Sequence, residues 1–143
     1  MFAVIDPSRI AKLLGIRSRV TTVAQLEQQI AAGLPKASLS AVARYVYGTS
    51  PDATALMQRV VPPATFHRRG EDLKPQEGER VERLARVIAT AEYVWDSAED
   101  AKAFLATEHA MLQGERPIEV ALTELGARRV ENLLWSLFYG VAA

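Results

Sequence analysis

Apolar residues recur at helical spacing along most of the chain. Within residues 35–48 they follow the i, i+3, i+4, i+7 pattern that marks one buried face of a helix: Leu39, Val42, Ala43 and Val46. Within residues 74–95 they are spaced alternately by three and four, which favours packing along another helix: Val81, Leu84, Ile88, Ala91 and Trp95. Both stretches are therefore predicted to be amphipathic helices.

Capping residues mark the limits of the first predicted helices. Thr22 and Gln25 have the spacing of a capping box, in which a hydroxyl and an amide satisfy free backbone N–H groups reciprocally. Gly33 stands where a left-handed C-terminal cap belongs, and Gly48 closes the helix of residues 35–48. The sequence therefore predicts two successive helices before residue 49.

Prolines delimit the middle of the chain. Ser50 is a candidate N-cap with Pro51 at the first helical position, where the missing N–H costs nothing, and this helix stops at the double proline of residues 62–63. The polar stretch that follows predicts a helix of about two turns that ends at Gly70.

The remaining segments are also predicted to be helices. Ser97, with Asp100 three residues later, caps one of them. Pro117 begins another, predicted to end at Gly126, and residues 127–139 form the last. Since no segment has a convincing strand pattern, we expect an all-α protein.

Composition narrows the class of protein. Of the 143 residues, 49% are apolar and 24% are charged, and no apolar run approaches the roughly 20 residues that span a membrane. The start of the chain lacks the pattern of a secretory signal. The absence of cysteine excludes disulfides, thiol catalysis and Cys-ligated zinc, and it fits a reducing compartment. We expect a globular cytoplasmic protein that does not bind membranes.

Charge is distributed unevenly although the net charge is zero. Residues 1–73 carry nine basic and five acidic residues, whereas residues 74–143 carry eight basic and twelve acidic ones. Such asymmetry is a hint that a nucleic-acid-binding part is joined to a part with another partner, although chance also produces it. We therefore expect an N-terminal domain over residues 1–73 and a C-terminal domain over residues 74–143.

The segment around the double proline is a candidate DNA-binding motif. A helix-turn-helix needs a helix, a tight break and a short second helix whose side chains reach base edges and phosphates. The candidate DNA-binding residues lie on the second helix or flank it: Arg59, Thr65, His67, Arg68, Arg69 and Lys74. An ordinary basic surface turn explains these residues equally well, so both interpretations stay open at this point.

Catalytic chemistry has little support in the sequence. His67 and His109 are the only histidines, and neither belongs to a metal-binding pattern. Glu108 and His109 are adjacent on a helix and point about 100° apart, so they do not form an acid–base couple. With no phosphate loop and no nucleophile elbow either, we expect no enzyme activity, no catalytic residues, no metal and no cofactor.

The last helix is apolar on more than one side. Its predicted inward stripe is Val130, Leu133, Leu134 and Leu137, while three aromatic residues point towards a different side: Trp135, Phe138 and Tyr139. Three explanations remain open: a second internal groove, a self-dimer interface, or a binding site for a different protein.

These residues together resemble the Xre-MbcA-ParS antitoxin family. The C-terminal half is similar to the family's toxin-binding domain. In that domain an aromatic–Leu pair is followed by Leu-x-Gly-x-x-Pro, then by a Thr, a Gly and a helix that ends in Gly. The matching residues of this chain are Phe104, Leu105, Leu112, Gly114, Pro117, Thr123, Gly126 and Gly140. The usual aromatic residue is Trp, so Phe104 is a mild departure that preserves packing. The segment "TFHRRGEDLKPQEGERVERLARV" resembles the family's recognition segment, and the likeness covers nearly the whole chain, more loosely in its N-terminal half.

The resemblance implies a helix-turn-helix-containing N-terminal helical bundle joined to a C-terminal helical toxin-binding domain. It also implies an antitoxin that binds a RES-domain toxin and inhibits it sterically. Such a toxin consumes NAD or transfers ADP-ribose from it. The antitoxin is further expected to repress its own operon by binding operator DNA. We expect aromatic anchors and an apolar tail to contact the toxin: Trp135, Phe138, Tyr139, Gly140, Val141, Ala142 and Ala143. The alternative is a stand-alone dimeric helix-turn-helix regulator.

A homodimer is expected because a helix-turn-helix that reads a palindrome needs two recognition helices about 34 Å apart. The apolar stripe of the long helix is a candidate dimer interface, although the same stripe also suits the core: Val81, Leu84, Ile88 and Trp95. With the toxin, the chain is expected to form a hetero-oligomer.

Overall fold

The computed structural model describes residues 5–68 and 70–140. Within these ranges the chain forms helices and no named β-strand, with isolated bridges only between residues 35 and 72 and between 109 and 115. The helices are α1 (Pro7–Leu13), α2 (Val23–Ala32), α3 (Lys36–Tyr47), α4 (Pro51–Val60), α5 (Pro63–Arg68), α6 (Pro75–Trp95), α7 (Ala98–Ala106), a short 3-10 helix (Ala110–Leu112), α8 (Pro117–Val120) and α9 (Glu124–Tyr139). The predicted all-α class is confirmed.

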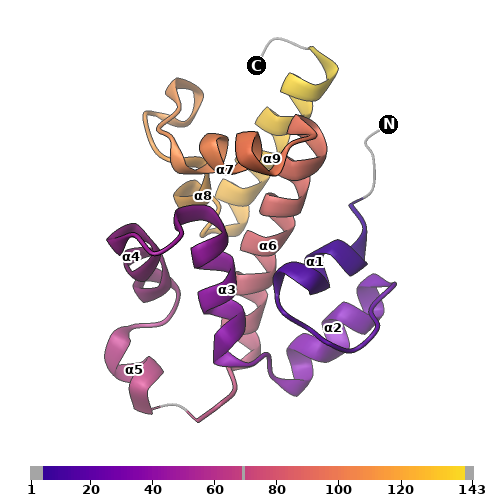
Figure 1. The fold of residues 1–143 in the computed structure, drawn as a ribbon, viewed down its shortest axis with the longest axis vertical. Helices are drawn as coiled ribbons and strands as arrows, with labels where there is room; N and C mark the ends of the chain where they lie inside the picture. The colour runs from indigo at the N-terminus through magenta and orange to yellow at the C-terminus, as the bar shows by residue number, and fades with distance from the viewer. Residues whose placement is uncertain (1–4, 69, 141–143) are drawn as a thin grey trace.

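The long helix α6 lies at the centre of the molecule. Figure 1 shows α1, α2 and α3 around one end of α6 and α7 and α9 beside the other, and α6 packs against each of these five helices. Its side chains Val81, Leu84, Val87 and Ile88 are completely buried. The sequence divides the chain just before α6, and this division at residues 73 and 74 stays a prediction.

The stripe that was a candidate dimer interface is part of this core. Val81, Leu84 and Ile88 have no exposed surface, so they cannot meet a second copy, and of the two uses considered for this stripe packing in the core is the correct one. Trp95 at the end of α6 is 39% exposed, and its ring contacts that of Phe104 at 5.9 Å. The alternating spacing of three and four residues between the apolar positions of α6 therefore reflects helix packing within one chain.

The capping residues of α2, α3 and α4 stand where they were predicted, but Gly33 is not in the left-handed helical conformation that was expected of it. The Thr22 hydroxyl accepts a hydrogen bond from Gln25 N–H at 3.1 Å while the Gln25 amide oxygen accepts one from Thr22 N–H, which completes the capping box. Gly33 and Gly48 follow the ends of α2 and α3 with φ of +105° and +63°, and Ser50 caps α4. The Ser97 hydroxyl caps α7 in the same way.

The prediction of a helix from Pro117 to Gly126 is wrong. α8 ends at Val120, and α9 begins at Glu124 because the Thr123 hydroxyl accepts from Gly126 N–H at 3.0 Å. Gly126 therefore lies inside the first turn of α9. It is a glycine because a Cβ at this position would lie 1.8 Å from the carbonyl oxygen of Val120. Gly126 was predicted to be a C-terminal cap, but it is required for close packing of the backbone.

The loop before α6 is tied to the start of α3. Leu73 N–H donates to the Leu34 carbonyl at 2.7 Å, Lys36 N–H donates to the Glu71 carbonyl at 2.9 Å, and both leucine side chains are buried. These contacts fix where α5 ends relative to the core. Among the described helices, none is long and apolar enough to cross a membrane.

Candidate functional site

The helix-turn-helix candidate is formed by α4, the turn at residues 61–62, and α5. α4 is anchored by buried Leu56 and Val60, and the guanidinium of Arg80 on α6 donates to the Val60 carbonyl at 3.2 Å. α5 has no fully buried side chain. Its partly buried Phe66 lies under the ammonium group of Lys36, 4.7 Å from the ring centroid. α5 is thus a short, peripheral helix whose outer side is open to solvent (Figure 1).

Three of the predicted DNA-binding residues share α5. Thr65 is half-buried, whereas His67 and Arg68 are exposed. Lys74 is exposed at the N-cap of α6, where its backbone N–H donates to the Glu77 carboxylate at 2.8 Å. Arg69 lies outside the described residues. The structure therefore places the four described side chains Thr65, His67, Arg68 and Lys74 on or just after α5.

Arg59 lies apart from this group. It is near the end of α4, and its guanidinium pairs with the Glu119 carboxylate of α8 at 2.9 Å. In this conformation its charge is matched by a carboxylate of the C-terminal half, so it is not presented as a free phosphate contact.

Arg59 belongs to a polar cluster that sequence reasoning missed, which we call the α4–α8 clasp: Tyr47, Asp52, Arg59, Arg116 and Glu119. The Tyr47 hydroxyl donates to Glu119 at 3.0 Å, and Arg116 pairs with Asp52 at 3.2 Å. The Arg116 guanidinium also lies 5.6 Å from the centroid of the Tyr47 ring. Burial is the main cause that raises the pKa of Tyr47, so this hydroxyl stays protonated and donates. The clasp joins residues about 60 positions apart in the sequence, which local patterns do not reveal.

A second polar cluster joins α1 and α3 to α6. Arg9 binds the Glu92 carboxylate with two hydrogen bonds of 2.7 and 2.6 Å, and Tyr45 donates its hydroxyl to the same carboxylate. Burial of Glu92 acts to raise its pKa, but the hydrogen bonds from Arg9 and Tyr45 together outweigh burial and lower the pKa. The carboxylate therefore stays ionised and holds three helices together.

The end of α9 and one residue of α6 form a cluster that we call the aromatic patch: Tyr93, Trp135, Phe138 and Tyr139. Between 43% and 47% of the surface of three members is exposed, whereas Trp135 is 7% exposed beneath them. The Tyr93 ring lies 5.5 Å from that of Phe138 and 5.7 Å from that of Trp135. Tyr93 is on α6 and was not predicted, because only the fold brings α6 and the end of α9 together.

Two expectations about α9 are corrected here. Leu137 was predicted to point inward but is 43% exposed, since the last turns of α9 extend beyond the neighbouring helices (Figure 1). Trp135 lies on the predicted side with Phe138 and Tyr139, but it was predicted as a toxin-contacting anchor and is only 7% exposed, so its ring is packed in the molecule. Gly140 ends the helix in the left-handed conformation with φ of +68°. Residues Val141, Ala142 and Ala143 lie outside the described residues.

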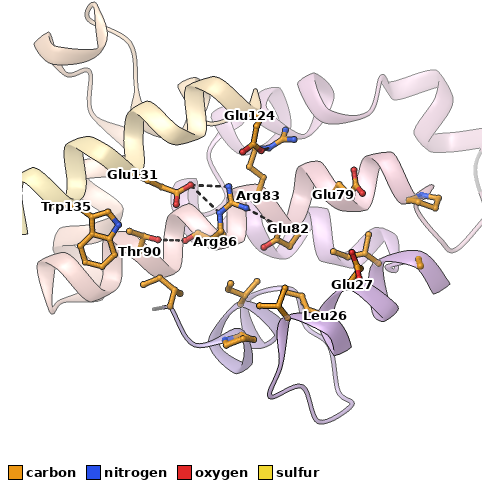
Figure 2. A pocket seen from close by; sticks show the side chains of 17 residues that line it. Leu26, Glu27, Glu79, Glu82, Arg83, Arg86, Thr90, Glu124, Glu131 and Trp135 are labelled. Atoms are coloured by element: carbon orange, nitrogen blue, oxygen red, sulfur yellow. Dashed lines mark hydrogen bonds and ion pairs between the residues drawn. The ribbon is translucent and has the colours of Figure 1, made fainter. Parts of the chain in front are cut away.

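Figure 2 shows a groove of about 550 Å³ between α1 and α2 on one side and α6 and α9 on the other. Apolar side chains such as Leu26 form one wall, and the opposite wall carries ion pairs: Arg86 with Glu131 at 3.1 Å and Arg83 with Glu124 at 3.2 Å. Burial is the main cause that raises the pKa of Glu82 beside them. These ion pairs join α6 to α9, and the four glutamates on this wall of the groove outnumber its two arginines.

The two histidines have local structural contacts. His109 Nδ1 accepts from Met111 N–H at 3.1 Å and so caps the 3-10 helix, and His67 meets the edge of Phe66 at 6.2 Å. In the part of the chain that the structure describes, no three His, Asp or Glu side chains gather as a metal ion would need.

Comparisons with known families identify both halves. Residues 25–86 match the Antitoxin Xre-like helix-turn-helix domain, and residues 90–140 match the Antitoxin Xre/MbcA/ParS C-terminal toxin-binding domain. No curated protein matches the chain. The first match contains α4, the turn and α5, and the second contains the clasp residues of α8 and all of α9. An N-terminal helix-turn-helix domain and a C-terminal toxin-binding domain are therefore confirmed, whereas the placement of the helix-turn-helix at α4 and α5 stays a prediction.

Proposed function

The chain belongs to the Xre/MbcA/ParS antitoxin family, and we propose that it neutralises a RES-domain toxin by covering the toxin's NAD-binding cleft. In the same proposal it represses its own operon as a homodimer in the cytoplasm. The coarser part, an antitoxin with a DNA-binding and a toxin-binding domain, follows from the two matched families. The toxin class, the inhibition mechanism and the binding residues are the proposal.

The observation that carries the toxin-binding part is the exposure of the aromatic patch. Monomeric proteins seldom leave several large apolar side chains exposed side by side unless the surface binds something. Here Phe138 and Tyr139 are 43% and 46% exposed with their ring centroids 5.0 Å apart, at the end of the matched toxin-binding domain. Aromatic residues dominate the energetics of many interfaces, so these two are the proposed anchors.

In this proposal Trp135 supports the two anchor residues, Phe138 and Tyr139. Its ring contacts Phe138 at 5.7 Å and Tyr139 at 6.3 Å from below. Gly140 ends the helix, and the small residues 141–143 are proposed to enter the NAD-binding cleft of the toxin. Such inhibition is steric and needs no catalytic group from the antitoxin.

The test is to co-express the toxin with variants of the patch. Phe138→Ala with Tyr139→Ala is expected to weaken toxin binding at least about 30-fold, since a single aromatic anchor already contributes about 2 kcal/mol or more, and growth protection is lost. Leu125→Ala is the matched control, because Leu125 is a large apolar residue of α9 with 69% exposure at the opposite end of the helix.

Deleting residues 139–143 is expected to abolish protection while the chain stays folded. Full protection by the deletion variant, or equal loss with Leu125→Ala, contradicts the proposed anchors. Protection against an unrelated toxin class instead of a RES-domain toxin contradicts the proposed partner.

The DNA-binding part of the proposal assigns base and phosphate contacts to Thr65, His67, Arg68, Arg69 and Lys74. The exposed outer side of α5 within the matched helix-turn-helix domain supports it. Arg59 joins the set only in a state in which it leaves Glu119.

Arg68→Ala with Arg69→Ala is expected to abolish the gel shift of promoter DNA. Binding by the unaltered protein is expected to weaken steeply with salt, and each lost phosphate contact lowers the log–log slope by about 0.9. Helicity measured by circular dichroism is expected to stay unchanged. A double variant that binds as well as the unaltered protein contradicts the assignment.

A further inference from the structure

The charges of the α4–α8 clasp are arranged as two complementary pairs. Asp52 and Arg59 are seven residues apart on α4, which places them on one face two turns apart. Arg116 and Glu119 are three residues apart at the start of α8. Arg116 pairs with Asp52 in the first turn of α4, and Glu119 pairs with Arg59 in the last turn. Both ends of α4 are thus held by one short helix of the toxin-binding domain.

Apolar packing holds α4 on one side only. Its buried side chains Ala53, Leu56 and Val60 belong to the core, and α4 packs against α3 and α6. Towards the C-terminal half, a cleft of about 320 Å³ separates α4 from the segment around α8, and Asp52, Arg116 and Glu119 line it. The clasp is therefore the connection that bridges this cleft.

α4 sets the position of the start of α5, whereas the loop of residues 71–73 ties the end of α5 to the start of α3. α5 follows α4 after two residues, has no fully buried side chain, and lies on the far side of α4 from α8 (Figure 1). A small rotation of α4 about the core therefore moves the exposed side of α5 relative to the rest of the domain. Each ion pair of the clasp is partly exposed and therefore individually weak. Together with the hydrogen bond of the Tyr47 hydroxyl, the two ion pairs bias the orientation of α4 more than they stabilise the fold.

We propose that Arg116 and Glu119, two residues of the toxin-binding domain, are positioning residues for operator binding. They hold α4 in one orientation through Asp52, Arg59 and Tyr47, and so present α5 correctly to DNA. Neither residue touches DNA in this proposal, which rests on the proposed DNA binding. Its consequence is that a change at α8 alters DNA affinity without altering any DNA contact.

The test is the double variant Arg116→Met with Glu119→Gln, which leaves the net charge unchanged. Its affinity is measured by fluorescence anisotropy with labelled duplexes that tile the region upstream of the gene, at several salt concentrations. We expect affinity to fall about tenfold because pre-organisation of α5 is lost. We expect the log–log salt slope to stay the same, because no phosphate contact is removed.

The matched control removes a different charge pair of the C-terminal half. Arg128→Met with Glu124→Gln also preserves net charge and removes the ion pairs of Glu124 with Arg128 at 3.8 Å and with Arg83 at 3.2 Å, neither of which involves α4. Its DNA affinity is expected to equal that of the unaltered protein. A rescue completes the design: Arg116→Asp alone weakens binding, and adding Asp52→Arg restores it to within about threefold because the reversed pair can form again.

The outcomes separate the two proposals. Unchanged affinity of the Arg116→Met, Glu119→Gln variant, or a salt slope lowered by about 0.9, overturns the positioning role while DNA binding stands. If the unaltered protein binds none of the duplexes, the proposed DNA binding fails and the positioning role fails with it.

A second measurement keeps the proposal testable if the double variant is poorly folded. The chain has no cysteine, so spin labels can be placed by Ala64→Cys on α5 and Glu99→Cys on α7. In the milder variant Glu119→Gln, the distance distribution between the labels is expected to broaden relative to the unaltered background. An equally narrow distribution contradicts the clasp as the device that orients α5.

Discussion

Gly126 lies in the first turn of α9, directly behind the carbonyl group of Val120. A Cβ there would approach the Val120 oxygen to 1.8 Å and the Thr123 hydroxyl to 2.8 Å, so Gly126→Ala must displace the turn between α8 and α9. We expect overpacking to lower the free energy of unfolding by about 3 kcal/mol, with the melting temperature falling by roughly 10 °C. The change in melting temperature is measured by thermal unfolding followed by circular dichroism. Gly70→Ala is the control, because nothing lies within 4 Å of that Cβ, and equal melting of both variants contradicts the argument.

Individual residues also show where sequence reasoning was sufficient. The fold class, most caps and the burial of Leu39, Val42 and Ala43 follow from spacing and from hydrogen bonds between neighbours in the chain. The exposure of Leu137 does not follow, because it depends on how far α9 extends beyond the helices beside it. The family resemblance identified the two functional parts, but the clasp and Tyr93 needed the fold, since their partners lie far away in the sequence.

The helices α1, α3 and α6 meet at the Glu92 carboxylate. Arg9→Met removes both hydrogen bonds of the guanidinium to this half-buried carboxylate, and we expect the free energy of unfolding at pH 7 to fall by about 1–2 kcal/mol. Because the folded-state pKa of Glu92 is lowered, its stabilising contribution is present above its unfolded pKa and is lost as pH falls through the folded pKa. The difference between the two proteins is therefore expected to be largest near neutral pH and to shrink below about pH 4.

Denaturant unfolding at pH 7 and at pH 3.5 measures this difference between Arg9→Met and the unaltered protein. Arg128→Met is the control, because Arg128 is 68% exposed and its ion pair with Glu124 joins two positions of a single helix. A difference that stays constant or grows at low pH contradicts the role assigned to Glu92.

At the scale of the whole molecule, the aromatic patch has two competing uses. It is the proposed toxin-binding surface, and in the alternative of a stand-alone regulator it is the dimer interface. The stripe on α6 no longer offers another interface, because Val81, Leu84 and Ile88 are buried in the core. The assembly state of patch variants therefore separates an antitoxin from a regulator whose last helix only dimerises.

Sedimentation of the isolated protein at micromolar concentration is expected to give twice the chain mass of 15.7 kDa. If the patch serves the toxin, Phe138→Ala with Tyr139→Ala still sediments as a dimer and still binds promoter DNA, because two copies are needed to reach half-sites about 34 Å apart. The same variant is expected to lose toxin binding, whereas Leu125→Ala keeps all three properties. A patch variant that becomes monomeric and loses DNA binding identifies the patch as the dimer interface instead. A strictly monomeric unaltered protein that binds operator DNA contradicts the homodimer itself.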